Sequence, residues 1–217
     1  MVGTTARQGG LEQINRLKQE LDSLRPLPAA AVHNLEEVFR VEWTYNSNAI
    51  EGNNLTLLVL EQGLTIGGKK LREHFEVINH AEAIQYVQDL VQRKQELTEH
   101  VPPHYTSVPE QMEQLMRWYV EQRDVIHPVL LAAEFHFRFV YIHPFSAGNG
   151  RTARLLMNLI LMEHGYPPAI VKVADAARLR YYETWEETSV QGHLQPFVSL
   201  IMECVAESLQ AYLFAVK

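Results

Sequence analysis

The chain has 217 residues, of which 47% are hydrophobic, enough to build one well-buried domain and too many for a disordered protein. Its 19 basic and 26 acidic residues give a formal net charge of −7, which argues against broad binding to nucleic acid or to an anionic membrane. The single cysteine, Cys204, excludes an intrachain disulfide. Residues 1–10 lack an apolar signal core, and no apolar run reaches the length of a membrane span. A cytoplasmic location is therefore expected.

Helical periodicity dominates the N-terminal part of the chain. Apolar residues at intervals of three and four predict an amphipathic helix through Leu11, Ile14, Leu17, Leu21 and Leu24. Two prolines, Pro26 and Pro28, end this helix, and a second helix is expected from about residue 29 to residue 48. Residues 51–54 indicate a turn, residues 55–64 a further helix, and residues 65–69 a loop with two adjacent glycines.

The middle of the chain continues the helical pattern. Residues 73–95 predict a long helix whose apolar face carries Phe75, Ile78, Ala81, Ile84 and Val87. The double proline in residues 101–104 favours extended backbone. Pro109 suits the first turn of another helix, and His127 with Pro128 opens the next one. The first of these helices is expected to continue through Tyr119, and the second through Leu131, Phe135 and Val140.

The C-terminal part is also helical. The helix that follows residue 154 is expected to end at Gly165, because two prolines come directly behind it. Residues 175–190 and 196–216 predict two more helices. Strand alternation is nearly absent, so the chain is predicted to be one all-α domain of roughly eight helices.

The most informative segment is residues 143–154, His-Pro-Phe-Ser-Ala-Gly-Asn-Gly-Arg-Thr-Ala-Arg, which leads directly into an apolar run. A loop that feeds a helix start presents unpaired backbone N–H groups and a positive dipole end, which suits an anion. Gly148 and Gly150 permit close backbone approach and positive φ, and Arg151 and Arg154 share one face of the first turn. The segment predicts phosphate chemistry without the GxxxxGK[ST] loop of other nucleotide-binding proteins.

Each of these side chains also has a structural interpretation. A histidine in an apolar region is ordinarily a packing residue, but His143 precedes the anion loop, where it could take a proton from a nucleophile. His127 and His136 lack such a context and are expected to be structural. Gly148, Asn149 and Gly150 could form only a turn and a helix cap, and the two arginines only surface ion pairs. The arginines beside the glycines favour the phosphate interpretation, because a guanidinium pairs well with phosphate oxygens.

Residues 143–154 resemble the signature of the Fic family, His-Pro-Phe-x-Asp/Glu-Gly-Asn-Gly-Arg-x-x-Arg, at every fixed position except one. A second motif, Ser-Asn-Ala-Ile-Glu-Gly at residues 47–52, is similar to the inhibitory-helix pattern of Fic proteins that carry this helix ahead of the core. The resemblance covers most of residues 11–217. It implies an all-α Fic fold divided into an N-terminal helical extension (1–28), an inhibitory-helix segment (29–60) and a Fic core domain (61–217).

The resemblance also implies an activity, the transfer of AMP from ATP to a Ser, Thr or Tyr hydroxyl of a target protein. It implies that His143 deprotonates this hydroxyl, and that Asn149 and the glycines around it hold the α-phosphate. It places Arg151 and Arg154 at the remaining phosphates, and Tyr182 beside the adenine. Ser189 falls where relatives often place a polar contact to the base. Relatives often form dimers, so a homodimer is implied by the same analogy.

The same resemblance gives Glu51 and Ser47 an inhibitory role. Alone, a glutamate before a glycine is ordinarily an exposed residue at a helix end. A carboxylate paired with Arg154 would instead occupy the arginine that should bind the γ-phosphate, and would repel that phosphate. In some relatives this glutamate positions water to remove AMP from a modified target, so the reverse reaction is an alternative function.

Two departures from the family pattern affect the expected activity. Ala147 stands where the family has an acidic ligand for Mg²⁺, and a methyl group offers magnesium no oxygen, so any magnesium would have to arrive on ATP. Relatives also carry a helix and a β-hairpin flap that docks the target, whereas residues 96–99 here run almost directly into the double proline. Transfer is therefore expected to be slow or absent, and a non-catalytic scaffold that binds nucleotide or protein is the second candidate function.

Overall fold

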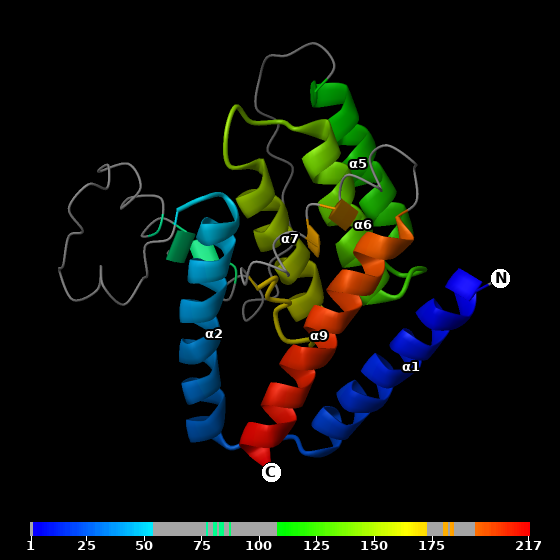
Figure 1. Cartoon of the computed structure of the whole chain (residues 1–217). Coiled ribbons are helices and arrows are strands. Elements are labelled where there is room, and N and C mark those ends of the chain that lie inside the picture. The colour runs from blue at the N-terminus through cyan, green and yellow to red at the C-terminus, as the bar shows by residue number, and fades with distance from the viewer. Residues whose placement is uncertain are drawn as a thin grey trace.

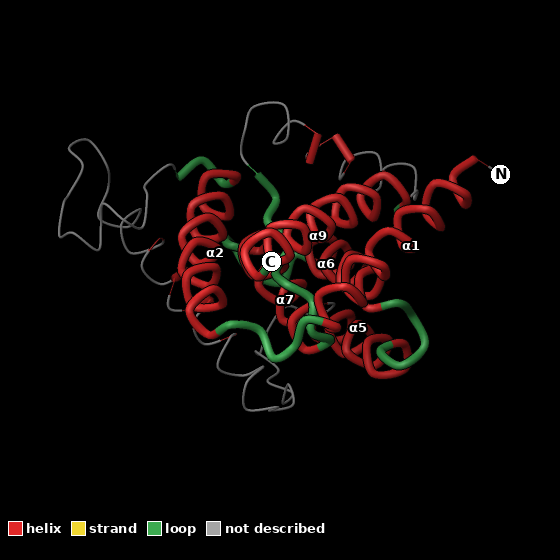
Figure 2. Tube along the Cα trace, turned by 90° about the horizontal axis from the view of Figure 1, so that it is seen from below, coloured by secondary structure: helices red, strands yellow, loops and turns green. Residues whose placement is uncertain are grey.

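The computed structural model describes residues 2–53, 77, 80–81, 83–84, 87, 108–172, 180–181, 183–184 and 194–217, with side chains from residue 7 onward. Within these residues the regular structure is entirely helical, as Figure 2 also shows, in agreement with the predicted all-α class. The helix predicted over 55–64, the loop over 65–69, the extended segment over 101–104, and the predicted adenine contacts Tyr182 and Ser189 lie outside the described residues.

The first two helices confirm the N-terminal predictions with two corrections. Helix α1 spans Val2–Ser23 and buries Ile14, Leu17 and Leu21. Leu24 was predicted to continue this stripe, but it follows the helix end and is 37% exposed. Helix α2 spans Ala29–Ile50, beginning directly after Pro28 because the fixed φ of that proline suits the residue before a helix. It continues two residues beyond the predicted end at Asn48, and this last turn is buried.

Three helices form the centre of the core. Helix α5 spans Val108–Gln122, α6 spans Pro128–Ile142, and α7 spans Asn149–Glu163. Helix α6 packs against both α5 and α7 and is apolar on nearly all sides, which is typical of a helix surrounded by protein. The ring of His127 caps α6, because its Nδ1 accepts a hydrogen bond from the Val129 N–H at 3.3 Å. The structural role predicted for His127 is thereby confirmed.

Helix α9, Gln195–Val216, lies against α1, α2 and α6 (Figures 1 and 2). The helix is long enough to cross a membrane, and its most apolar 18 residues have a mean hydropathy of 1.4, which is apolar enough for a membrane span. This finding is contrary to the expectation that no apolar run is long enough. Of these 18 residues, 56% are buried inside the fold, and nine residues of the helix belong to the hydrophobic core. Burial against three neighbouring helices accounts for its apolar composition.

Two short stretches complete the described fold. The described residues between 77 and 87 are helical, and the predicted apolar face is buried at Ala81, Ile84 and Val87. Ile84 and Val87 pack with Phe39 and Trp43 of α2 in one cluster. Residues 180, 181, 183 and 184 are also helical, within the helix predicted over 175–190. The C-terminal end of α2 contacts the first turns of α7, next to the predicted phosphate loop (Figure 1).

Candidate active site

His143 ends helix α6 and begins the loop. Its backbone has φ 53° and ψ 54°, and its N–H donates to the Phe139 carbonyl oxygen at 3.2 Å. A non-glycine residue in this left-handed region costs on the order of 1 kcal/mol and is concentrated at functional sites. The histidine is exposed to solvent. The chain therefore presents His143 as an accessible imidazole at the edge of the loop.

Asn149 holds the shape of the loop. Its side-chain oxygen accepts from the Phe145 N–H at 2.9 Å, and its amide nitrogen donates to the Phe145 carbonyl at 2.6 Å. Only 3% of Asn149 is exposed. The Phe145 ring is 41% exposed, so the amide of Asn149, and not burial of that ring, holds the Phe145 backbone. Asn149, predicted as a phosphate contact, thus also positions the backbone that would surround a phosphate.

The two glycines of the loop serve different purposes. Gly148 is the N-cap of α7 with φ +85°, which confirms the predicted positive φ. Gly150 lies inside the first turn of α7, where it needs no unusual backbone. A Cβ at Gly150 would overlap Oε1 of Glu51 and lie 3.1 Å from Nη1 of Arg154. The missing side chain at Gly150 therefore makes room for the contact between Glu51 and Arg154.

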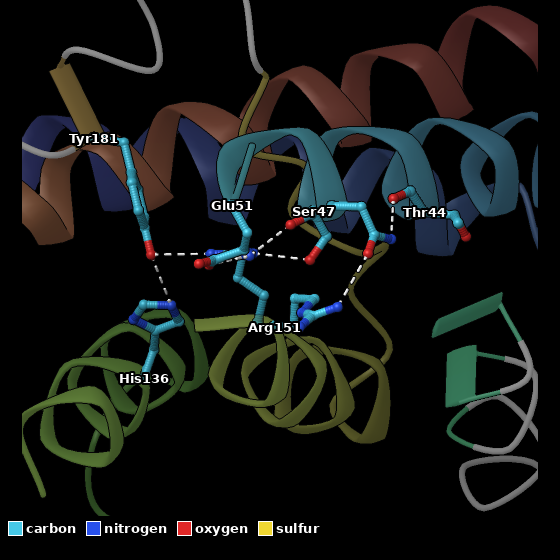
Figure 3. Close-up of polar contacts among 8 residues, drawn as sticks. Thr44, Ser47, Glu51, His136, Arg151 and Tyr181 are labelled. Atoms are coloured by element: carbon cyan, nitrogen blue, oxygen red, sulfur yellow. Dashed lines mark hydrogen bonds and ion pairs between the residues drawn. The ribbon is translucent and has the colours of Figure 1, made fainter. Parts of the chain in front are cut away.

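Arg154 lies at the centre of the site. It is 2% exposed, and it donates four hydrogen bonds to described residues. Its Nε donates to Oγ of Ser47 at 2.9 Å, and its Nη2 donates to the Ser47 carbonyl at 2.7 Å. Its Nη1 donates to the Tyr181 hydroxyl at 3.3 Å. The sequence motifs that named Ser47 and Arg154, 107 positions apart, come together in one contact (Figure 3).

Glu51 completes the shell around this guanidinium. Its Oε1 lies 2.9 Å from Nη2 of Arg154, with side-chain exposures of 36% for Glu51 and 3% for Arg154. Ser47 on the last turn of α2 and Glu51, the C-cap of that helix, both contact Arg154, and Figure 3 shows these two side chains at the end of α2. Because Arg154 is buried, this pair is screened less than a surface ion pair. A carboxylate of the chain itself therefore pairs with the guanidinium that, according to the motif, would bind an incoming anion.

Replacing Gly150 with alanine tests this arrangement. In the unchanged chain, Gly150→Ala is expected to lower the free energy of unfolding by about 1 kcal/mol, because the new Cβ displaces Glu51 from Arg154. In a Glu51→Gly background the same change is expected to be neutral or stabilising by up to about 1 kcal/mol, because alanine favours a helix over glycine. Urea unfolding measures both differences.

The matched control is Gly9→Ala, because Gly9 is helical and an added Cβ there would meet no atom within 4 Å. It should stabilise both backgrounds equally. An equal effect of Gly150→Ala in the two backgrounds would contradict the role assigned to Gly150.

Asn48 is a further contact that the motifs did not indicate. Its Oδ1 lies 3.4 Å from Nη1 of Arg151, and its amide donates to the Thr44 carbonyl one turn earlier at 2.8 Å. The same α2 segment thus contacts both arginines of the signature, Arg154 through Ser47 and Glu51 and Arg151 through Asn48 (Figure 3). Sequence reasoning missed Asn48 because an asparagine near a helix end is ordinarily a capping residue.

Two buried histidines lie in the electric field of these arginines. Burial, together with the charge of Arg154, lowers the pKa of His136 to about 3. Burial, and then the charges of Arg154 and Arg151, lower the pKa of His80 to about 3. Both rings are therefore neutral at physiological pH. Neither has a sequence context that signals the arginines, because their proximity is created by packing between separate helices.

Ala147 does not fit a metal. It is exposed in the bend over residues 145–147, and its methyl group supplies no oxygen ligand. In the described part of the chain no group of three or more His, Cys, Asp and Glu side chains is placed to hold a metal ion. Glu51, the carboxylate that contacts the loop, is bound to Arg154. The donor set at this loop therefore does not match a protein-bound magnesium ion.

Fold and site together define a class of protein: an all-α domain whose arginine-lined helix start is blocked by a carboxylate from a preceding helix. A sequence profile described as the Fic/DOC family matches residues 71–161. The structure of Fic-1 from C. elegans is 30% identical and superposes with a TM-score of 0.83, covering 99% of this chain and 73% of that one, and its glutamate-to-glycine variant superposes with a TM-score of 0.85 over 98% of this chain. The chain belongs to the Fic/DOC family.

Two further relatives extend the comparison. A Fic domain-containing signalling protein from Bacteroides thetaiotaomicron superposes with a TM-score of 0.84 at 28% identity, over 94% of this chain and 97% of that one. The curated "Protein adenylyltransferase Fic" of Nematostella vectensis is 32% identical over 95% of this chain and 59% of its own length. The chain thus spans about half to three-fifths of the curated relatives it matches, since the Culex quinquefasciatus protein is covered over 48%.

The comparison also bears on the prediction that this chain lacks the helix and β-hairpin flap that relatives carry before the double proline. The alignment to the Nematostella protein is 255 positions long, whereas 95% of this 217-residue chain is about 206 residues, so about 49 positions have no counterpart here. The relative therefore carries additional residues inside the matched region. The position at which we predict the gap, between residues 99 and 101, lies outside the described residues.

Proposed function

We propose that this chain is a self-inhibited protein adenylyltransferase, which transfers AMP from ATP to a Ser, Thr or Tyr hydroxyl of a target protein. The observation that carries the proposal is the pair of Arg154 and Glu51, because a buried guanidinium at a helix start is neutralised by an internal carboxylate where an anionic ligand would bind. Relatives at 31–32% identity that are named protein adenylyltransferases support the reaction class.

The chemistry follows from the placement of the loop residues. His143 takes the proton of the target hydroxyl, and the hydroxyl oxygen forms a bond to the α-phosphorus of ATP. The bond from the α-phosphorus to the bridging oxygen breaks, and pyrophosphate leaves with that electron pair. The first backbone N–H groups of α7, Arg151 and Arg154 stabilise the negative charge on the phosphates. Asn149 keeps the loop in the conformation that surrounds them.

Inhibition follows from the same contacts. Glu51 neutralises Arg154 and places a negative charge where the terminal phosphate would lie, while Asn48 engages Arg151. ATP then lacks the guanidinium that orients its phosphates for in-line attack. Withdrawal of the end of α2 would break these contacts to both arginines together, because Ser47 and Asn48 lie in its last turn and Glu51 is its C-cap.

A second function is favoured by one observation, the methyl group at Ala147. A Fic scaffold that binds nucleotide or a partner protein without turnover needs the arginines but no metal ligand. The reverse reaction, removal of AMP from a modified target with water positioned by Glu51, uses the same residues. Measured turnover decides between a catalytic and a non-catalytic protein, whereas binding alone does not.

The first test is Glu51→Gly. Loss of the carboxylate is expected to raise the affinity for ATP between about 5-fold and about 150-fold, the usual range for an internal competitor that is coupled to a ligand. Isothermal titration calorimetry measures the affinity, and self-modification with labelled ATP measures transfer.

The matched control is Glu37→Ala, which removes another α2 carboxylate paired with an arginine, Arg40, at 3.0 Å. It should leave ATP affinity unchanged. Equal ATP affinity in the Glu51→Gly variant and in the unchanged chain would contradict the inhibitory role of Glu51. ATP binding without any transfer would favour the non-catalytic scaffold.

We also propose a cytoplasmic location and a homodimer. The first is supported by the single cysteine, Cys204, which is free and buried, and the second by analogy with relatives alone.

A further inference from the structure

Arg154 has two kinds of hydrogen-bond partner. Three of its four hydrogen bonds to described residues go to the end of α2, through the Ser47 side chain, the Ser47 carbonyl and the C-cap residue Glu51. These three contacts belong to the helix that must withdraw if the chain is to bind ATP productively. The fourth goes to the Tyr181 hydroxyl, which lies outside α2. Tyr181 is therefore the described partner that can stay with Arg154 when α2 leaves.

Tyr181 is itself held by a second buried residue. Its hydroxyl accepts from Nη1 of Arg154 at 3.3 Å and lies 3.4 Å from Nε2 of His136 (Figure 3). A phenol hydroxyl has one proton, so it can accept from the arginine and donate to the imidazole at the same time. The carbon of the guanidinium also lies 5.8 Å from the centre of the Tyr181 ring, within range of a cation–π contact.

The neutral imidazole of His136 can accept this hydrogen bond. It has no exposed surface, it stacks on Phe197 with ring centres 5.0 Å apart, and it meets the Tyr181 ring edge-on at 6.2 Å. Burial and the neighbouring Arg154 lower its pKa to about 3, so the imidazole stays neutral at physiological pH. With Nε2 accepting, the proton lies on Nδ1, which has no hydrogen-bond partner among the residues that the structure describes.

We propose that Tyr181 and His136 are positioning residues, which hold the Arg154 guanidinium at the start of α7 while Glu51 and Ser47 withdraw and a nucleotide polyphosphate takes their place. The proposal deepens the function above and rests on it. A free arginine side chain would have to be ordered anew by each ligand, at a cost in affinity. The pair Tyr181–His136 removes this cost, because both residues lie outside the inhibitory segment.

The test uses the chain with Glu51→Gly as parent and compares ATP, ADP and AMP by calorimetry. Tyr181→Phe keeps the ring and removes only the hydroxyl. It is expected to weaken ATP binding about tenfold, the effect of losing one hydrogen bond to a charged group. AMP binding should be unchanged, because AMP lacks the phosphates that Arg154 would hold. Tyr119→Phe is the matched control, since it removes another buried hydroxyl, bonded to Glu163 at 3.3 Å.

Substitutions at His136 separate positioning from packing. His136→Phe keeps an aromatic ring against Phe197 but removes the acceptor, and it should reproduce part of the loss in ATP affinity. His136→Gln places an amide oxygen near the position of Nε2, and it should restore affinity toward that of the parent. If the two variants lose ATP affinity equally, His136 acts through packing and its positioning role is rejected.

The outcomes for this proposal and for the proposed function are distinct. A Glu51→Gly parent that binds ATP no better than AMP rejects the proposed function. A parent that prefers ATP, with a Tyr181→Phe variant that prefers it equally, rejects the positioning role alone. A cycle of Tyr181→Phe and Arg154→Met in urea unfolding tests the contact without any nucleotide. Additive effects in that cycle would also overturn the proposal.

Discussion

Replacing Ala147 with aspartate, in a chain that also carries Glu51→Gly, is expected to raise AMP transfer by on the order of a hundredfold over Glu51→Gly alone, comparable to the effect of one added stabilising group in other active sites. The physical reason is the missing oxygen donor at residue 147. A carboxylate there would supply a hard ligand for magnesium beside the phosphate loop. Ala147→Asp with Glu51 intact should stay nearly inactive, because Arg154 would still be bound by Glu51.

The measurement is self-modification with labelled ATP, together with the affinity of each variant for Mg²⁺ in the presence of ATP. Ser146→Asp is the matched control, because residue 146 is also exposed in the same bend but the family pattern leaves its position unrestricted. A gain at residue 147 and not at residue 146 assigns the defect to Ala147. No gain in either metal affinity or transfer would show that Ala147 is not what limits the chain.

The helical framework could be predicted from the sequence because it depends on local patterns. The spacing of Ile14, Leu17 and Leu21 and the prolines at residues 26 and 28 predict α1 and the start of α2, and both are confirmed. Leu24 fits the same pattern but lies past the helix end. Periodicity alone does not show that the helix ends before Leu24.

The blocked site could be predicted only from the two motifs taken together. Neither Glu51 nor Arg154 has a local signal for a partner 103 positions away, and the resemblance supplied the pairing. The positive φ of Gly148 follows from glycine chemistry. The need for glycine at residue 150 could not be predicted from glycine chemistry, because it arises from the Glu51 carboxylate, which approaches from the end of another helix.

The remaining parts of the site depend on tertiary packing. Tyr181 and His136 are 45 positions apart, and both resemble ordinary core residues in the sequence. Their link to Arg154 exists because Tyr181 packs between His136 of α6 and the buried guanidinium of α7. Asn149 is a related case. Its position in the motif indicated a phosphate contact, whereas its hydrogen bonds to Phe145 show how the loop keeps its shape.

His143→Asn, made in the chain with both Glu51→Gly and Ala147→Asp, is expected to lower AMP transfer between about a hundredfold and ten-thousandfold, the usual contribution of a general base. Asparagine is chosen because it tolerates the left-handed backbone at this position, so the loop should keep its conformation. ATP affinity should be unchanged, since the groups that contact the phosphates belong to the start of α7.

The control is His164→Asn at the opposite end of α7, where the imidazole Nδ1 lies 2.8 Å from the Ile160 carbonyl oxygen. It should leave both ATP affinity and transfer as they were. If His143→Asn transfers AMP as fast as its parent, the proton of the target hydroxyl goes elsewhere. If it loses ATP affinity as well, His143 shapes the phosphate loop, and the αL backbone at residue 143 serves binding in place of proton transfer.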